Sequence, residues 1–413
     1  MKILHVAHTF YPCLSFGGVV NAAYQIGLEQ VKNGDEVHVY TTDTCKQRLE
    51  LDNRYDVDVC GIKVDYFRNI SNRIKNLTLI DTPLSAVFRI RKDIKNYDVI
   101  HIHEHRQTLA IITTYYARKY NIPYVVQAHG SVLPFFQKEK LKEIYDKLWG
   151  FKTLRCANKV FALTETEKKQ YLSMGVPEDN VEIVPLGINL EEYDLEKYSS
   201  GVIRKRYGIS DDETVLLFLG RIHEIKGLDL LIESFNELKK DEYNVKLLIV
   251  GPDDGFESII KQKVNDYNLS ESVIFTGPLY SEDKISALVD CDIFIMPSQY
   301  ESFTTSGLEA MACGKPLILT KNNHIHDWVE NNVGLTCEYD KDDLKNSMIK
   351  LINDTQLRGK FGESGKKLVK NEYNWDKISN KIIEIYKSIL WNFFNLEIKS
   401  NLIRYYLYYN KTI

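Results

Sequence analysis

The sequence predicts an α/β protein of two domains, each built on a doubly wound parallel sheet. Short apolar, β-branched runs alternate with amphipathic helical stretches from end to end, which is typical of a parallel sheet covered by helices on both faces. The alternation occurs twice, and a polar segment without strand character separates the two halves. The chain has 413 residues, too many for one compact core.

Each half contains six runs that predict strands. In the first half these are residues 3–8, 36–42, 99–104, 123–129, 159–164 and 181–187. In the second half they are residues 215–221, 246–251, 273–277, 292–298, 316–320 and 334–338. The polar segment between them places the boundary near residues 190–212, so we expect domains at 1–195 and 196–374.

The C-terminal segment, residues 375–413, reads as a helix that becomes strongly aromatic and weakly basic. One interpretation is a terminal helix that packs back across both domains. The other is an interfacial anchor, because Trp and Tyr favour the headgroup layer of a membrane. The two interpretations can hold for different parts of the segment.

The composition of the chain indicates which classes of partner to expect. Lys and Arg number 53 against 57 Asp and Glu, so the overall charge predicts no nucleic-acid partner. Two local basic stretches, residues 88–95 and 138–159, are typical of solvated helix faces but also suit anionic lipid headgroups. No run of about 18 apolar residues predicts a membrane-spanning helix, and the first residues lack the pattern of a signal peptide. We therefore expect a cytoplasmic location.

The seven cysteines are scattered and show no CxxC spacing. This pattern argues against a disulfide framework and against a structural zinc site. Reduced thiols are the expectation.

The stretch ESFTTSGLEAMACGKP, residues 301–316, follows a predicted buried strand and opens a helix. The helix N-terminus at residues 302–306, with Ser302, Phe303, Thr304 and Thr305, offers backbone N–H groups to a pyrophosphate. Glu309, about one turn into the helix, is placed to accept hydrogen bonds from ribose hydroxyls. Glu301, on the strand side, would face the group beyond the distal phosphate. A capped helix with surface glutamates is the alternative.

The first loop of the same domain supplies the cations. GRIHEIKGLD, residues 220–229, follows a strand, and Gly220 allows a tight exit from it. Arg221 and Lys226 then project from the loop, and together they could neutralise a diphosphate leaving group without a metal. No convincing pair of acidic metal ligands follows a strand.

These segments, with YNWDKI at residues 373–378, resemble the retaining glycosyltransferases of family 4, which have the GT-B fold of two facing Rossmann-like domains. The resemblance implies that Arg221 and Lys226 bind the donor diphosphate, Glu309 the ribose, and Glu301 the transferred sugar. It also implies a C-terminal helix that crosses back to the first domain. The chain departs from the family pattern where Thr304 replaces the usual glycine, so a Cβ could crowd the phosphate or restrict φ.

In the first domain, Gly17 and Gly18 lie in the loop between the first strand and first helix, where adjacent glycines permit close approach to a ligand. An ordinary turn is the alternative. The resemblance implies that this loop closes over the donor phosphate. His129 ends a predicted strand, and the resemblance places it near the transferred sugar; a structural histidine is the alternative.

The motif HIHEH, residues 101–105, has histidines at alternate positions. Two histidines on one face of a strand can chelate zinc. The first positions lie in a predicted buried strand, however, and no further ligand obviously completes a set. We expect no metal, with His101 in the core and His103 lining the acceptor side.

The prediction is a metal-independent glycosyltransferase, a hexosyltransferase that uses a nucleoside-diphosphate sugar and retains the anomeric configuration. The acceptor expected from the basic stretches and the aromatic segment is a lipid-linked glycan of surface polysaccharide assembly, met at the inner face of the membrane. Two other classes stay open: a GT-B sugar-nucleotide epimerase, which would need acid/base carboxylates in the first domain, and a zinc hydrolase built on HIHEH. A non-catalytic binding module is disfavoured because both cations and carboxylates are present.

Overall fold

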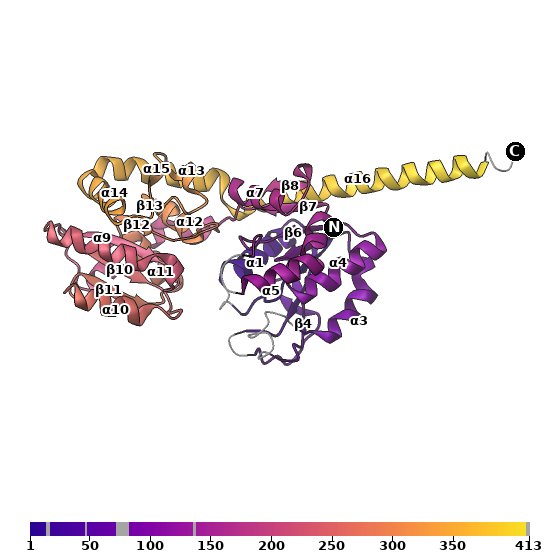
Figure 1. The fold of residues 1–413 in the computed structure, drawn as a ribbon, viewed down its shortest axis with the longest axis horizontal. Helices are drawn as coiled ribbons and strands as arrows, with labels where there is room; N and C mark the ends of the chain where they lie inside the picture. Colours follow the sequence, from indigo (N-terminus) through magenta and orange to yellow (C-terminus); the bar gives the residue numbers. More distant parts are fainter. Residues whose placement is uncertain (14–16, 46–47, 72–81, 135–137, 410–413) are drawn as a thin grey trace. The chain divides into compact units, whose positions relative to one another are not determined.

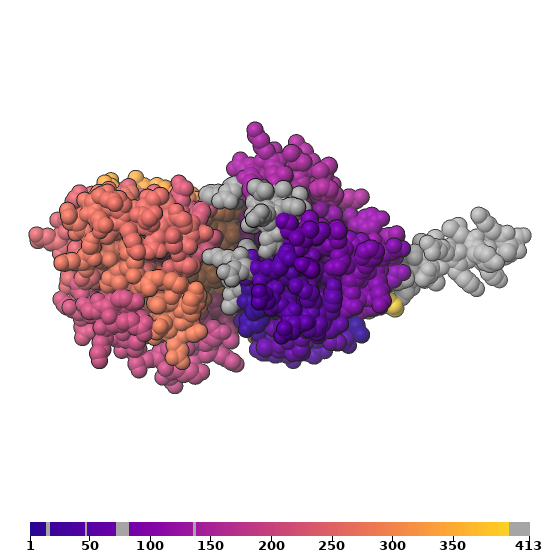
Figure 2. All heavy atoms as spheres, turned by 90° about the horizontal axis from the view of Figure 1, so that it is seen from below, coloured from indigo at the N-terminus to yellow at the C-terminus, as the bar shows by residue number. Residues whose placement is uncertain are grey.

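The computed structural model describes residues 1–13, 17–45, 48–71, 82–134 and 138–409, and the side chains up to residue 395. The chain forms two compact units (Figure 1). Unit 1 comprises Met1–Pro185 and Trp375–Ile413, and unit 2 comprises Leu186–Asn374. In the space-filling view of Figure 2, the surface of unit 1 runs from indigo to magenta, because residues 1–185 fold into this one unit.

Unit 1 is built on an eight-stranded sheet in the order β3-β4-β2-β1-β5-β6-β7-β8. Its strands are β1 (Lys2–Val6), β2 (Glu36–Thr42), β3 (Val57–Val59), β4 (Ile62–Phe67), β5 (Val99–His103), β6 (Tyr124–Gln127), β7 (Lys159–Ala162) and β8 (Val181–Ile183). All neighbours run parallel except β3 and β4. From β1, the chain first adds strands on one side of the sheet (β2, β4) and then on the other (β5 to β8). Ligands of doubly wound sheets bind at such a switch point, so the carboxyl ends of β1 and β5 are the expected place for a ligand.

The α-helices of unit 1 are α1 (Gly18–Lys32), α3 (Leu84–Asp93), α4 (Thr108–Tyr120), α5 (Glu139–Tyr145), α6 (Phe151–Arg155), α7 (Glu165–Ser173) and α16 (Trp375–Tyr409). A π-helical turn, Asp146–Gly150, joins α5 to α6. Short 3-10 turns lie at Ile94–Asn96 and Glu178–Asn180. The main core is formed by the apolar strand residues together with the inner faces of α3, α4, α6 and α7.

Figure 1 shows α16 as one continuous helix. It packs against α1. Its first half buries apolar residues at helical spacing, among them Ile378, Ile382 and Ile389, whereas Trp391 and Phe394 are exposed. The expectation that the C-terminal helix returns to the first domain is thus confirmed for its first half. No helix among the described residues is long and apolar enough to cross a membrane.

Unit 2 is built on a parallel six-stranded sheet in the order β11-β10-β9-β12-β13-β14. Its strands are β9 (Thr214–Leu219), β10 (Val245–Val250), β11 (Val273–Gly277), β12 (Ile293–Met296), β13 (Leu317–Thr320) and β14 (Gly334–Cys337). Its α-helices are α8 (Val202–Arg206), α9 (Leu228–Lys240), α10 (Glu257–Asp266), α11 (Ser281–Asp290), α12 (Thr305–Ala312), α13 (His326–Val329), α14 (Lys341–Asn353) and α15 (Thr355–Glu372). In this sheet the chain adds β10 and β11 on one side of β9 and then β12 to β14 on the other, so the switch point lies between β9 and β12.

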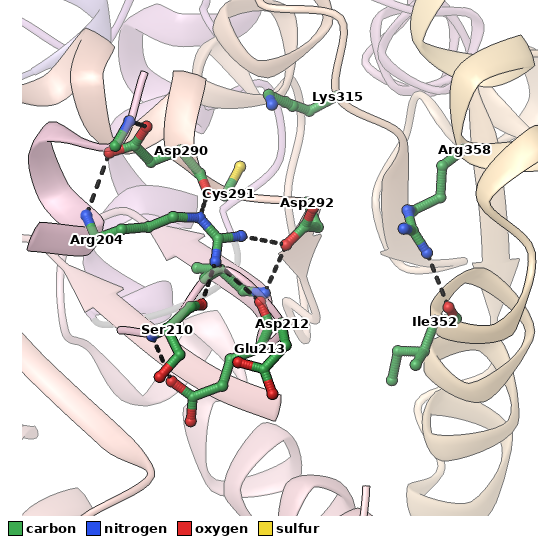
Figure 3. Close-up of polar contacts among 12 residues, drawn as sticks. Arg204, Ser210, Asp212, Glu213, Asp290, Cys291, Asp292, Lys315, Ile352 and Arg358 are labelled. Carbon is green, nitrogen blue, oxygen red and sulfur yellow. Dashed lines mark hydrogen bonds and ion pairs between the residues drawn. The ribbon is translucent and has the colours of Figure 1, made fainter. Parts of the chain in front are cut away.

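An arginine joins the first elements of unit 2 to its sheet. Arg204 on α8 donates to Asp292 at 2.7 Å and to the carbonyl oxygens of Ser210 and Glu213, both at 2.9 Å (Figure 3). Asp290 in turn accepts from the first backbone N–H groups of α8, including Ile203 at 2.6 Å. Charge-assisted bonds of this kind fix α8 against the ends of β9 and β12.

The predicted fold class is confirmed: two parallel-sheet α/β units, with all twelve predicted strands present. The division falls at residue 185, a few residues before the predicted 190–212. The hairpin of β3 and β4 was not predicted from the sequence. Its strands are short and carry Asp and Lys at alternate positions, so they lack a continuous apolar run.

The expectation that all seven cysteines are reduced is wrong for two of them. Cys13 and Cys45 form a disulfide, with their Cα atoms 5.8 Å apart. Cys13 follows β1 and Cys45 follows β2, and adjacent parallel strands bring their carboxyl ends together. The two cysteines are 32 residues apart, and no sequence motif of cysteine spacing predicts a disulfide at that separation.

Candidate active site

The β9–α9 connection in unit 2 carries both predicted cations, and each has a carboxylate partner. Arg221 is exposed and forms an ion pair with Asp254, which follows β10. Lys226 is largely buried and forms an ion pair with Glu301, which follows β12. The structure therefore brings Lys226 and Glu301 together, although the sequence analysis assigned them to different parts of the donor.

A glycine sets the position of Lys226. Gly227 ends the 3-10 turn Glu224–Lys226 with φ 68°, and a Cβ there would lie 1.9 Å from the carbonyl oxygen of Pro297. Only glycine combines this φ with so close an approach. The turn that carries Lys226 is thus held against the end of β12.

The N-terminus of α12 is capped by Thr304. Its Oγ1 accepts from the backbone N–H of Gly307 at 3.1 Å and lies 3.1 Å from Ser306 Oγ. Thr304 has φ −95°, an ordinary extended value, so the backbone does not need the glycine that is usual in the family. Phe303 is buried and packs near Tyr373, so only its backbone is available to a ligand.

Glu309 on α12 is held by a residue that the sequence analysis missed. Lys284 on α11 forms an ion pair with Glu309 at 2.8 Å and donates to the hydroxyl of Tyr193 at 3.2 Å. Burial, reinforced by the charge of Glu309, raises the pKa of Tyr193 far above its usual range. Nothing in the local sequence around Lys284 distinguishes it from an ordinary surface lysine.

The carboxyl edge of the unit 2 sheet thus holds three cations and three carboxylates in ion pairs. Arg221 and Lys226 come from the β9–α9 connection and Lys284 from α11, and they pair with Asp254, Glu301 and Glu309. Cations at this edge suit a diphosphate, and carboxylates suit hydroxyl groups. The predicted donor-site residues therefore converge at the edge where doubly wound sheets bind ligands.

In unit 1, Gly17 precedes the first turn of α1 with φ 66°, a value that favours glycine. Gly18 is the first residue of α1, and a Cβ on either glycine would meet no atom within 4 Å. Residues 14–16 of the same loop lie outside the described residues. Close approach of a ligand to this loop stays a prediction.

His129 follows β6 with a left-handed φ of 52°, and its side chain is partly buried, with Nδ1 fully enclosed. Its Nε2 lies 3.0 Å from Nδ1 of His103. Burial lowers the pKa of His129 to about 4, although the nearby Glu104 opposes this shift. The ring is therefore neutral at pH 7.

Glu104 is a carboxylate at the carboxyl end of β5 that the sequence analysis did not single out. Its Oε2 accepts from Gln107 Nε2 at 2.8 Å and lies 3.0 Å from Nδ1 of His8, which follows β1. Burial opposes ionisation, but His8 and Gln107 outweigh it, so the pKa of Glu104 lies below its usual range. Glu104 also has φ 63°, a strained value of the kind that clusters at functional sites.

The motif HIHEH is buried except for Glu104, as expected for its first positions. The prediction that His103 lines the acceptor side is wrong, because its side chain has no exposed surface and it reaches the carboxyl edge only through His129. His105 lies beyond the end of β5 and faces Asp146 at 3.5 Å. The alternation therefore places only two of the three histidines on one strand face.

The structure completes a histidine set that the sequence did not reveal. Ring nitrogens of His5, His101 and His103 lie within 4.8 Å of one another, which is compatible with metal ligation. His5 Nδ1 and His103 Nε2 lie 2.9 Å apart, at hydrogen-bond distance. Among the described residues, a second set of this kind is His38, Asp56 and Asp65, which also makes ion pairs with Arg89.

Comparison with known proteins identifies the family of the chain. Two family models match: Glycosyltransferase Family 4 over residues 16–192, and Glycosyl transferases group 1 over residues 200–368. The chain is 25% identical to a Methanocaldococcus jannaschii glycosyltransferase over 402 residues, covering 94% of this chain and 98% of the relative. It is 25% identical over 355 residues to the Staphylococcus aureus capsular polysaccharide biosynthesis glycosyltransferase CapM, covering 78% and 89%.

Solved structures share the fold. The sucrose-phosphate synthase of Thermosynechococcus elongatus superposes with a TM-score of 0.75 at 20% identity, covering 94% of this chain and 99% of that one. HepE of Anabaena, solved with UDP, superposes with a TM-score of 0.73 at 18% identity, covering 94% and 100%. The epimerase and zinc-hydrolase alternatives find no support in these relatives. The chain belongs to the glycosyltransferases of the GT-B fold, with a family 4 module in its first part and a group 1 module in its second.

Proposed function

We propose that this glycosyltransferase moves a hexose from a nucleoside-diphosphate sugar to a hydroxyl group, with retention of the anomeric configuration. The observation that carries the proposal is the set of three cations and three carboxylates at the carboxyl edge of the unit 2 sheet. The relative of known structure crystallised with UDP-glucose supports a nucleotide-sugar donor.

Charge develops on the departing diphosphate as the bond from sugar to phosphate breaks. Arg221 and Lys226 would neutralise it, together with the backbone N–H groups at the N-terminus of α12. Two fixed cations can perform this role without a divalent metal, so we propose a metal-independent reaction. Glu309 would hold the ribose hydroxyls, and Glu301 would face the transferred sugar once Lys226 turns to the phosphates.

In unit 1, His129 would contact the transferred sugar and Glu104 would accept a hydrogen bond from the attacking hydroxyl. Within the described residues, Oε1 of Glu104 has no hydrogen-bond partner, whereas Oε2 is held by His8 and Gln107. A hydroxyl bound to Oε1 would be oriented for attack. For a front-face reaction with retention, its proton passes to the leaving phosphate oxygen.

For the acceptor we propose a lipid-linked glycan of surface polysaccharide assembly, met at the cytoplasmic face of a membrane. The similarity to CapM supports polysaccharide synthesis. Trp391 and Phe394 are exposed on α16, and aromatic side chains of this kind favour the interface of a bilayer. Lysines on and beside α5 would add attraction to anionic headgroups.

The first test is thermal stabilisation by a panel of nucleoside diphosphates and their sugars, without added metal, for the wild type, Lys226→Ala and Glu309→Ala. We expect one base to raise the unfolding temperature by several degrees in the wild type and in neither variant. Lys345→Ala is the matched control, because Lys345 forms an ion pair with the exposed Asp241 at the other end of α9 from the β9–α9 connection. A panel without any shift in the wild type would contradict the proposed donor site.

The acceptor is tested separately, by transfer from the donor found in this way to lipid-linked glycans in vesicles with and without anionic lipid. Transfer to a water-soluble sugar alone, without vesicle binding, would remove the lipid-linked acceptor from the proposal and leave the donor site intact.

A further inference from the structure

Three imidazoles form a row inside unit 1. His5 on β1, His103 on β5 and His129 after β6 lie side by side, with hydrogen-bond distances of 2.9 and 3.0 Å between successive rings. Neighbouring rings are nearly parallel, at 16° and 15°. The row begins at Gln30 on α1, whose Oε1 lies 2.7 Å from His5 Nε2. It ends at His129, beside the carboxyl edge of the sheet.

All three rings are neutral at pH 7. Burial lowers the pKa of His5 to about 4, although the hydrogen bond to Gln30 opposes it, and lowers the pKa of His103 well below its usual value. His129 has a pKa of about 4 for the same main reason. A neutral imidazole carries one proton, so it donates at one nitrogen and accepts at the other. In a row of neutral rings, the partner at one end therefore sets the direction of every hydrogen bond.

Gln30 supplies that partner. Its carbonyl oxygen can only accept, so His5 donates from Nε2 and accepts at Nδ1. His103 must then donate to His5 from Nε2 and accept at Nδ1, and His129 must donate to His103 from Nε2. The row leaves Nδ1 of His129 without a proton. That atom is buried and has no hydrogen-bond partner among the described residues.

We propose that Gln30, His5 and His103 are positioning residues that hold His129 in the Nε2–H tautomer and so make its Nδ1 an acceptor for a substrate hydroxyl. The inference rests on the proposed function where it places His129 beside the transferred sugar. Buried polar groups are costly unless each is paired, so a row that pairs both nitrogens of His5 and His103 and leaves Nδ1 of His129 unpaired indicates a partner for that atom.

His101 provides a matched control. It is as fully buried as His5 and His103 and stacks on His103 at 4.2 Å between centroids. Its Nδ1 bonds instead to the hydroxyl of Tyr386 on α16, at 2.8 Å. It therefore lies beside the row, and its removal should leave the direction of the row unchanged.

The test is the ¹⁵N spectrum of the full chain labelled in histidine, which distinguishes a protonated ring nitrogen from a bare one. His129→Asn assigns the signals. We expect the wild type to carry its His129 proton on Nε2. His101→Asn leaves Gln30 and the three rings in place, so it should preserve the tautomer. Gln30→Met removes the acceptor, so we expect both tautomers of His129 in comparable amounts.

Two results would overturn the proposal. One is a wild-type His129 protonated at Nδ1, which needs no variant to fold. The other is a stoichiometric metal ion by elemental analysis, because a metal would occupy the same nitrogens of His5 and His103 that form the row. The spectrum is recorded without donor or acceptor. It can therefore contradict the proposed tautomer without contradicting the proposed donor site. A panel of nucleotides without effect would contradict the proposed function and leave the tautomer result untouched.

Discussion

The ion pair between Lys226 and Glu301 should stabilise unit 2 in the absence of donor, and its contribution can be measured. The two side chains are 15% and 14% exposed. Exposed pairs contribute about 0–1 kcal/mol, and breaking a fully buried pair costs about 3–5 kcal/mol. A pair between these limits should show a coupling free energy of about 2 kcal/mol.

The assay is a double-mutant cycle of Lys226→Ala, Glu301→Ala and the double variant. Urea unfolding would be followed by hydrogen exchange of peptides from unit 2, so that unfolding of unit 1 does not enter. The control cycle uses Lys321 and Glu338, an ion pair of the same unit with 44% and 64% exposure, which should show no measurable coupling. Equal coupling in the two cycles would refute the idea that burial strengthens the Lys226–Glu301 pair.

Three further predictions concern single residues. Glu104→Gln should slow transfer at least tenfold and leave the donor affinity unchanged, because an amide binds the attacking hydroxyl less well than a carboxylate does. Initial rates measure the transfer and calorimetry measures the donor affinity. Equal losses of transfer rate and donor affinity would place Glu104 at the donor instead. Gly227→Ala should destabilise unit 2 by more than Gly208→Ala in urea unfolding, since both have positive φ but only the former meets a backbone oxygen, that of Pro297. Burial raises the pKa of Glu167 to about 7, against two backbone N–H groups that lower it, so its folded state holds a proton that the unfolded state releases near pH 4.5. The buried histidines with lowered pKa values act in the opposite direction, but they are the same in both proteins, so the stability advantage of the wild type over Glu167→Gln should shrink between pH 4.5 and 7.

The fold was predictable because its strands are read directly from the chain. A strand buried on both faces needs a continuous apolar run, and such runs are visible without any tertiary information. The hairpin of β3 and β4 lies at the edge of its sheet, where alternate polar side chains such as Lys63 stay exposed, so the same signal is missing.

The convergence of the proposed donor-site residues at one sheet edge was predictable, and their pairings were not. Arg221, Lys226, Glu301 and Glu309 lie next to strand ends, and strand ends of a parallel sheet meet at one edge. Which cation meets which carboxylate depends on side-chain reach across the edge, and Lys284 enters from a helix with no local signal.

The histidine row was hidden for a similar reason. HIHEH drew attention to alternate histidines on one strand, but the hydrogen bonds run between strands. His5 and His103 become neighbours because β1 lies next to β5, and the order of strands in the sheet is not written in either segment. Sequence spacing therefore predicts contacts along an element better than contacts across a sheet.

The pairing of Lys226 with Glu301 has a consequence for donor binding that separates the two roles of Glu301. A diphosphate must draw Lys226 away from this carboxylate, so the pair opposes binding of the nucleotide alone. Removing the carboxylate in Glu301→Ala leaves Lys226 available, and the affinity for the nucleoside diphosphate should rise by up to about thirtyfold, the value for loss of about 2 kcal/mol of competition. Transfer of the sugar should nevertheless slow, because the contact to the sugar is lost. Calorimetry with the nucleoside diphosphate and rates with the nucleotide sugar measure the two effects separately. If Glu301→Ala weakens binding of the diphosphate, Lys226 does not exchange partners, and the carboxylate instead holds the lysine in place for the phosphate.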